Sequence, residues 1–242
     1  PTPPPAGQVF AVPAAESLSS AEVGTVIARA AAEARGRGVS ATIAVTDRVG
    51  NVLAVFAMPG AAPTARIPSA PDGSNQDAQG IVIPSAGAAI AKAITGAYLS
   101  SSGNAFSTRT ASFIVQEHFP PAPTTAGLES GPLFGVQFSQ LPCSDLAARA
   151  SDGLIGPKRS PLGLAADPGG FPLYKNGVVV GGVGVIADGT YGFDPNVLDR
   201  DVDVDEAIAL AGTVGFEAPV AVRADRISAD GTSLRYTDVE YP

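Results

Sequence analysis

The 242-residue chain has no tryptophan and only one cysteine, one methionine and one histidine. A lone cysteine excludes an internal disulfide, so packing alone must hold the fold together. Cys143 could pair with another chain, bind a metal ion, or be a buried, inert thiol. A serine–histidine–aspartate triad would have to recruit the single histidine, His118, and the sequence contains no Gly-x-Ser-x-Gly motif. The composition therefore gives little support to nucleophilic catalysis.

Charge is scarce as well. Charged residues make up 16% of the chain, the net charge is −8, and 45% of the residues are hydrophobic. A compact protein of this kind is a poor binder of nucleic acid, because phosphates require a basic face. The longest apolar runs, such as Val178 to Ala187, are well short of the roughly 20 residues that cross a bilayer. We expect no membrane span and no nucleic-acid partner.

The first residues, PTPPPAGQVFAVP, are rich in proline. Such a segment is typical of an exposed arm that remains after removal of a signal peptide. We therefore expect residues 1–16 to form an N-terminal arm, residues 17–242 to form a single domain, and the protein to be secreted or periplasmic.

The most informative segment is Gly169 to Asp188, GGFPLYKNGVVVGGVGVIAD. Asn176-Gly177 predicts a two-residue turn, because both residues tolerate the positive φ that a type I′ turn requires. Gly181, Gly182 and Gly184 interrupt the second strand, which indicates a bulge or a close approach of another backbone or a flat ligand. The segment is predicted to be a β-hairpin.

The remaining pattern predicts an α+β fold, an antiparallel sheet of about five strands with helices packed on it and a small C-terminal hairpin. Ser19 and Glu22 form a capping box at the start of the first helix. Residues 59–84 lack periodicity and are predicted to be a long surface loop. The other expected elements are the hairpin Val39–Thr46 and Val52–Met58, the strand Leu133–Phe138, the helices Ser85–Leu99, Ser107–Phe119 and Val204–Phe216, and the hairpin Arg223–Ile227 and Leu234–Tyr236.

Four motifs follow one another along the chain. They are Ile43–Asp47 with Gly50–Leu53 and Met58, Ala91–Thr95, Gly131–Gly135, and Gly169–Leu173 with Gly177 and Val180–Val185. In this order they resemble the GlcG/HbpS-like haem-binding family, which also supplies the C-terminal domain of certain corrinoid adenosyltransferases. The resemblance implies a haem-binding homo-oligomer. Typical members are much shorter, and the excess here lies at about residues 61–84, at 102–167 and after Phe216.

Lys92, Thr95 and Tyr98 are spaced to share one face of the Ser85–Leu99 helix. The helix is rich in glycine and alanine, so a neighbour can approach it closely. This pattern is typical of tight packing against a sheet or a subunit. The resemblance instead implies that Lys92 pairs with an anionic group and that Thr95 points into a pocket, which would form a cofactor crevice beside this helix.

Arg109 and His118 complete the candidate cofactor site. Arg109 could be a second partner for an anion or an exposed arginine in the first turn of its helix. His118 could interact with the carbonyls at the end of that helix or ligate haem iron, with Phe113 and Phe119 as an apolar wall. It is the candidate metal ligand. The absence of Cys-x-x-Cys-His excludes covalent c-type attachment.

A run of acids precedes the last helix, with Asp199, Asp201, Asp203 and Asp205 at alternate positions and Glu206 next. Val204 stands where an EF-hand requires glycine, so the run does not fit a calcium loop. Acids ahead of a helix complement its dipole, and we expect a solvated helix N-terminus here.

Three hypotheses remain open. The first is a secreted, homo-oligomeric haem-binding protein that acts as a carrier, sensor or accessory module. The second is a cofactor-free enzyme that acts on a small organic acid or ring compound in the same crevice, with Asp47, Lys92 or Glu117 as acid or base. The third is a structural subunit that kept the fold without the pocket.

Overall fold

The computed structural model describes residues 15–69, 79–115, 160–194, 196, 199–229 and 231–240. Its centre is a four-stranded antiparallel sheet with the strand order β2-β1-β6-β5. The strands are β1 (Thr42–Asp47), β2 (Val52–Ala57), β5 (Gly170–Lys175) and β6 (Val178–Ile186). The middle of the sheet thus joins a hairpin from the first third of the chain to a hairpin from the last third.

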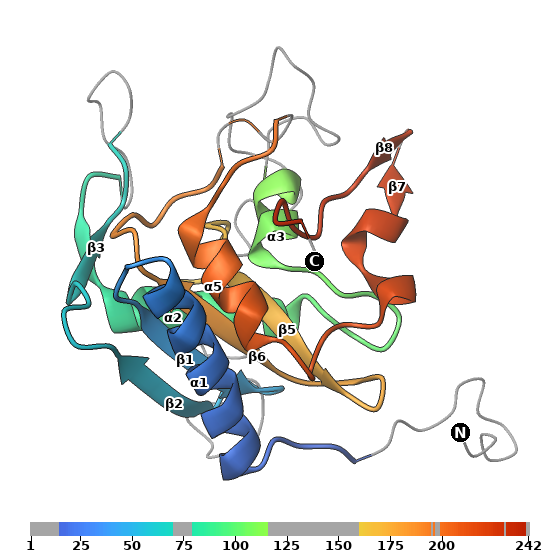
Figure 1. Cartoon of the computed structure of the whole chain (residues 1–242). Helices are drawn as coiled ribbons and strands as arrows, with labels where there is room; N and C mark the ends of the chain where they lie inside the picture. Colours follow the sequence, from blue (N-terminus) through green and yellow to red (C-terminus); the bar gives the residue numbers. More distant parts are fainter. Residues whose placement is uncertain are drawn as a thin grey trace, which may run out of the picture.

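Helices cover both faces of the sheet, which confirms the predicted α+β class (Figure 1). α1 (Ser20–Gly36) and α5 (Val204–Gly212) lie side by side on one face, and α2 (Ser85–Tyr98) packs on the other. The short α3 (Thr108–Ile114) lies beyond the end of α2, next to β5. Within the described residues, no helix is both long and apolar enough to cross a membrane.

Local signals explain where these elements begin and turn. The Ser19 hydroxyl accepts a hydrogen bond from the Glu22 amide, and the Glu22 carboxylate accepts one from the Ser19 amide at 2.7 Å, so the predicted capping box is present. Between β5 and β6, Asn176 and Gly177 have φ values of 51° and 78°, as the predicted turn requires. The glycine-rich hairpin is therefore confirmed.

Gly182 and Gly184 of the hairpin face the backbone of α2. A Cβ at Gly182 would overlap the carbonyl oxygen of Ala93, one at Gly184 would overlap that of Ala89, and one at Gly96 would overlap the backbone at Phe171. We call this contact of α2 with β5 and β6 the glycine seam. At this seam the backbones of α2 and the sheet lie so close together that only glycine, which has no Cβ, fits between them.

Several predicted elements differ from the structure. Among the described residues the main sheet has four strands, where we predicted about five. The predicted loop 59–84 contains a short ribbon, β3 (Thr64–Arg66) with β4 (Val82–Pro84). The C-terminal hairpin is present but short, with β7 at Ser228–Ala229 and β8 at Thr232–Ser233, after two 3-10 turns at Val220–Val222 and Ala224–Arg226. The predicted strand Leu133–Phe138, residues 1–14 of the arm, Cys143 and His118 lie outside the described residues.

Candidate functional site

Lys92 and Thr95 lie on the buried side of α2, away from water. Lys92 is fully buried, and its ammonium group donates to the Asp205 carboxylate at 2.8 Å and pairs with the Asp167 carboxylate. The Thr95 hydroxyl donates to the carbonyl of Ala91 at 2.7 Å and accepts from the amide of Ala165 at 2.7 Å. The chain's own groups therefore occupy the polar atoms that we predicted to contact a ligand.

The segment 160–167, which we call the cover segment, lies over α2. Ala165 and Asp167 bond to Thr95 and Lys92, and the Leu162 side chain is 3.9 Å from the position that a Cβ on Gly87 would take. Ala165 and Leu162 also pack with the alanines of α2 in one hydrophobic cluster. The cover segment belongs to the insertion predicted at about 102–167, and it closes the face of α2 where we predicted a crevice.

Burial dominates the electrostatics around Lys92. Desolvation raises the pKa of Asp167 to about 8, although Lys92 opposes the shift, and burial likewise raises the pKa of Asp205 to about 6. Burial alone would lower the pKa of Lys92, but the two carboxylates outweigh it and raise it above its usual value. The Lys92 cluster is therefore an ammonium group facing one carboxylate and one largely protonated acid at neutral pH.

Tyr191 adds a fourth titratable group to the Lys92 cluster. Its side chain is 9% exposed, and among the described residues its hydroxyl has no hydrogen-bond partner. Burial raises its pKa, and the Asp167 carboxylate raises it further. A lysine that stays charged is unsuited to act as a base, so Lys92 does not fit that half of the acid or base role considered from the sequence.

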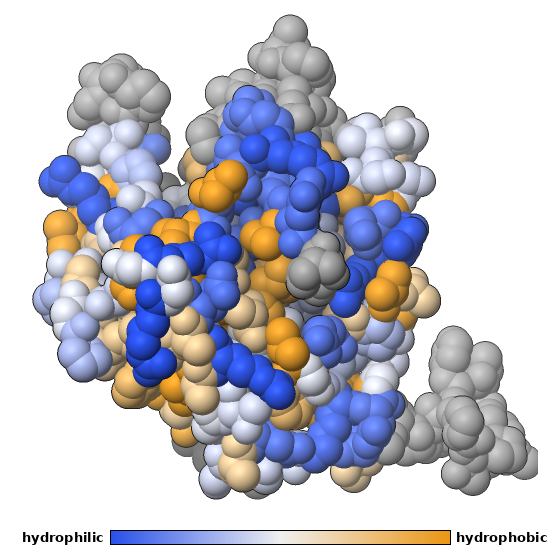
Figure 2. Space-filling model, in the orientation of Figure 1, coloured by the Kyte–Doolittle hydropathy of each residue, from blue (hydrophilic) through white to orange (hydrophobic). Residues whose placement is uncertain are grey.

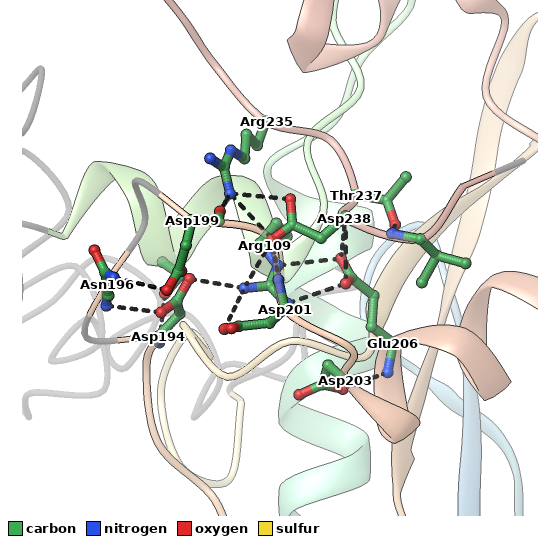
Figure 3. Close-up of polar contacts among 12 residues, drawn as sticks. Arg109, Asp194, Asn196, Asp199, Asp201, Asp203, Glu206, Arg235, Thr237 and Asp238 are labelled. Atoms are coloured by element: carbon green, nitrogen blue, oxygen red, sulfur yellow. Dashed lines mark hydrogen bonds and ion pairs between the residues drawn. The ribbon is translucent and has the colours of Figure 1, made fainter.

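Arg109 occupies a second buried cluster, between α3, α5 and the C-terminal segment (Figure 3). Its side chain is 1% exposed. Nε and Nη2 donate to the two oxygens of Glu206 at 3.3 and 3.1 Å, and Nη1 donates to Asp194 at 2.8 Å. Asp201 and Asp238 lie 3.6 Å away. Arg109 thus pairs with anions, as one prediction had it, but the anions belong to the chain.

The carboxylates of the Arg109 cluster are partly shielded from water. Burial raises the pKa values of Glu206 and Asp194 above their ordinary values, although Arg109 opposes the shift. Burial would lower the pKa of Arg109, but Glu206 and its acidic neighbours raise it above its usual value. The guanidinium group therefore remains charged and is paired with the chain's own acids.

The acidic run before α5 differs from our expectation. Asp203 accepts a hydrogen bond from the Glu206 amide at 2.7 Å and caps α5, as acids at a helix start commonly do. Asp205 and Glu206, in contrast, are 1% and 0% exposed and point to Lys92 and Arg109. The prediction of a solvated N-terminus was wrong for these two residues, because the sequence does not show the buried cations they neutralise.

One group of carboxylates has the spacing of a metal site. Oxygens of Asp194, Asp199 and Asp201 lie within 4.8 Å of one another. The guanidinium of Arg109 contacts two of them, Asp194 and Asp201, so a cation is already present in this cluster. The short distance between the carboxylates of Asp194 and Asp201 is therefore explained by their shared contact with Arg109.

Tyr98, the remaining described candidate, lies apart from both clusters. It is half-buried, and its hydroxyl donates to the carbonyl of Val49 in the turn between β1 and β2 at 3.0 Å. Asp47, considered as a base, accepts from the amides of Val49 and Asn51 at 2.9 and 2.8 Å. Both side chains hold this turn together, so the structure does not bring Tyr98 into a common site with Lys92 and Arg109.

A cavity of about 400 Å³ lies near the C-terminal hairpin and is lined in part by Arg200, Arg223, Arg235 and Tyr236. Arg223 donates to the carbonyl of Ala218 at 3.0 Å and stacks over the Tyr236 ring. Arg235 donates to the Asp238 carboxylate at 3.1 Å. Two of the three arginines are therefore engaged by the chain itself.

Sequence reasoning identified both buried cations but missed their partners. Asp167, Tyr191, Asp194 and Asp238 gave no signal, because each stands alone in a segment without periodic pattern. Asp205 was recognised only as part of the acidic run. A buried partner 113 residues away from Lys92 is a property of the tertiary fold.

No known family model matches the sequence, and no curated protein is significantly similar to it. Solved structures with a similar fold include protein ORFY of Klebsiella pneumoniae, of the DUF336 family, with 17% identity and a TM-score of 0.49 over 86% of this chain and 97% of that one. A double mutant of HbpS from Streptomyces reticuli has 18% identity and a TM-score of 0.45, over 88% and 99% of the two chains. A PduOC:heme complex has 17% identity and a TM-score of 0.45, over 82% and 94%.

HbpS without these mutations is also among the solved structures found, with 18% identity and a TM-score of 0.44. A likeness of this degree concerns the course of the backbone. It says nothing about which small molecule this chain binds.

Proposed function

We propose that this protein binds haem, on the face of α2 that the cover segment closes. The glycine seam carries the proposal. Of the four motifs that resemble haem-binding proteins, one spans β1, its turn and β2, one lies in α2 and one in β5 and β6. The last two meet at the glycine seam. Because a side chain at Gly182 or Gly184 would overlap the α2 backbone, these two motifs form a single packing unit rather than independent matches.

The residues around α2 have the chemistry that haem requires, but in the described part of the chain Asp167 and Ala165 occupy Lys92 and Thr95. A porphyrin needs an apolar slot and cations near its propionates. The α2 alanines and Lys92 supply these groups. The carboxyl group of Asp167 lies beside Lys92, where a propionate would have to bind. The amide of Ala165 donates a hydrogen bond to the Thr95 hydroxyl, so this group is engaged as well. Haem does not fit beside α2 while the cover segment is in place.

Binding at this face therefore requires that the cover segment moves. A propionate would then take the place of the Asp167 side chain beside Lys92. His118 remains our proposed iron ligand. Met58 does not fit this role, because it is 7% exposed and its sulfur accepts a hydrogen bond from the Ala41 amide at 3.4 Å.

A haemin titration of the apo protein tests the proposal. We expect a saturable Soret band in the wild type. Asp167→Ala weakens the contact between the cover segment and Lys92, so it should bind haemin more tightly. If the lost contact contributes about 1.4 kcal/mol, the affinity should rise by about tenfold or more. Asp201→Ala, which removes an exposed acid remote from the cover, is the matched control and should bind as the wild type does.

His118→Ala should bind haemin with a shifted Soret maximum. An unchanged spectrum in this variant would remove only the ligand assignment. The absence of saturable binding in both the wild type and Asp167→Ala would overturn haem binding itself.

A second function is favoured by the saturation of the predicted site. Lys92, Thr95 and Arg109 all have partners within the chain, as expected for a structural subunit that kept the fold without an open pocket. This alternative predicts that haemin leaves the spectra of wild type and Asp167→Ala unchanged, while the protein still assembles with other chains in light-scattering measurements.

We also propose that the protein acts outside the cytoplasm, as a secreted or periplasmic carrier, sensor or accessory protein. The proline-rich composition of residues 1–13 supports this proposal. Immunoblots of fractionated source cells test it, and detection in the cytoplasmic fraction alone would contradict it.

A further inference from the structure

The cavity of about 400 Å³ beside the C-terminal hairpin lies apart from the face of α2. We call it the C-terminal cavity. Among the described residues, its lining includes none from α2 or the cover segment, and all of it except Arg200 comes after Phe216. That stretch is the tail by which this chain exceeds typical members of the family it resembles. Figure 2 shows hydrophilic residues beside the hairpin, at the right of the molecule, where β7 and β8 lie in Figure 1.

Positive charge gathers in the C-terminal cavity, although the protein as a whole is acidic. The net charge of the chain is −8, yet the lining holds three arginines against two acids, Asp225 and Glu240. Asp225 also lies 3.8 Å from the guanidinium group of Arg226, which is not part of the lining. An excess of cations in a hollow of an acidic protein favours an anionic ligand.

Arg200 is the arginine of this lining that the chain does not engage. It is exposed, and among the described residues no carboxylate or carbonyl oxygen accepts a hydrogen bond from its guanidinium group. A guanidinium group presents its N–H donors as a planar fork, which matches two oxygens of a carboxylate or a phosphate. Arg200 can therefore offer this fork to a ligand without breaking a contact of the fold.

Arg235 is held by the chain through one nitrogen. Nη1 donates to the carbonyl of Asp199 and to the carboxylate of Asp238, whose two oxygens lie 3.1 Å away. Nε and Nη2 carry the remaining N–H groups, and among the described residues no acceptor bonds to them. Figure 3 shows these two nitrogens directed away from Asp199 and Asp238. Because the side chain is 20% exposed, these donors are fixed in place and partly shielded from water.

Arg223 and the ring of Tyr236 form a fixed wall of the cavity. Arg223 donates through Nε to the carbonyl of Ala218 at 3.0 Å, and its guanidinium carbon lies 5.3 Å from the centre of the Tyr236 ring. Tyr236 in turn is 3% exposed and packs edge-on against Phe171 of the core. These contacts set the position of the Arg223 charge before a ligand arrives, which lowers the entropy cost of binding.

We propose that the C-terminal cavity binds a small organic anion with more than one carboxylate or phosphate group. Arg200 and Arg235 supply the donors for its oxygens, and Arg223 adds a fixed positive charge. The volume exceeds the needs of a single anionic group and lies at the lower end of the range of about 300–1,000 Å³ that is typical of small-molecule sites. This site does not depend on haem binding at α2, because the two share no described residue.

Isothermal titration calorimetry of the full chain tests this inference, with citrate as the carboxylate probe and pyrophosphate as the phosphate probe. Sodium chloride holds the ionic strength constant, so that screening is the same in every titration. We expect saturable binding of at least one probe to the wild type. Binding of citrate alone would identify carboxylates as the ligand groups, binding of pyrophosphate alone would identify phosphates, and binding of both would show that the site accepts either oxyanion.

Arg200→Gln should weaken the binding of that probe by about tenfold or more, because it removes a charged donor. The variant should fold as the wild type does, since Arg200 has no partner among the described residues. Arg66→Gln is the matched control, because Arg66 is an exposed arginine of β3 outside the cavity. It should bind the probe with the affinity of the wild type.

Arg235→Lys tests the second arginine without removing its charge. The lysine keeps an ammonium group for Asp238 but lacks the planar fork, so we expect a similar loss of affinity. The inference would be overturned if neither probe bound saturably to the wild type. It would also be overturned if Arg200→Gln and Arg235→Lys both bound the probe as tightly as Arg66→Gln.

Discussion

The two buried cations of this protein, Lys92 and Arg109, are both neutralised by acidic side chains, but in different ways. Lys92 is a point charge held by two carboxylates, one of which stays largely protonated at neutral pH because burial raises its pKa. Arg109 directs a planar fork at Glu206 and Asp194, with two further acids within 3.6 Å. The Lys92 cluster can adjust its charge by taking up protons, whereas the Arg109 cluster depends on a permanent cation. The predictions below test that difference.

Arg109→Met should have the largest effect. It leaves Glu206, Asp194 and Asp238 buried together without their shared cation, and loss of one partner of a buried pair costs about 3–5 kcal/mol. We expect a loss of at least this size in the free energy of unfolding, measured by urea denaturation. Arg200→Met, which changes an exposed arginine, is the control. A loss below about 1 kcal/mol in the unfolding free energy would mean that the ion pairs with Arg109 do not stabilise the fold.

Lys92→Met should be destabilising at pH 8 by about 3 kcal/mol and much less so at pH 5. The physical reason is that Asp167 and Asp205 have raised pKa values, and without the lysine both can remain neutral at the lower pH. Urea denaturation at the two pH values measures this difference. Equal losses at pH 5 and pH 8 would show that packing of the lysine stem, rather than its charge, accounts for the effect.

Asp167 should make the wild type less stable as pH rises. Its pKa is about 8 in the folded protein and 3.8 in the unfolded chain, so between these values the folded state holds a proton that the unfolded state releases. Stability should therefore fall by up to about 1 kcal/mol per pH unit from pH 4 to pH 8 from this group and then level off. Asp167→Asn keeps the shape and removes this slope. Melting temperatures of both proteins across the range would show parallel curves if the prediction were wrong.

Asp201→Asn should have the smallest effect. The Asp201 side chain is 47% exposed and lies 3.6 Å from Arg109, and exposed ion pairs contribute about 0–1 kcal/mol. We expect a change below about 0.5 kcal/mol in the unfolding free energy. A larger loss would mean that Asp201 contributes to stability as much as the buried partners of Arg109 do.

Much of the fold could be predicted, because its signals are local. Ser19 with Glu22 predicted the start of α1, Asn176-Gly177 predicted the β5–β6 turn, and the small residues of α2 predicted a close neighbour. β3 and β4 could not be predicted, since each has three residues and each is stabilised by pairing with the other across a gap of 15 residues. Short strands of this kind owe their structure to the partner rather than to their own sequence.

The candidate site was less predictable than the fold. Lys92 was a candidate because the family resemblance implied an anionic partner for it, and Arg109 was a candidate as a second partner for an anion. Whether such a charge meets a ligand or the chain's own carboxylate depends on segments that are distant in sequence. For Lys92 the deciding residue is Asp167, in an insertion whose path over α2 no local pattern encodes.

The pairing of β1 with β6 has a consequence for how this chain can vary. Thr42 lies opposite Ile186, so the two central strands close a loop of more than 140 residues that contains α2, α3 and the cover segment. The entropy of closing such a loop grows only logarithmically with its length, and doubling the length costs roughly 0.6 kcal/mol. The two hairpins therefore act as a clamp, and the chain between them can lengthen with little thermodynamic penalty. Insertions or deletions in this loop could therefore add or remove a segment that covers α2 with little change in stability.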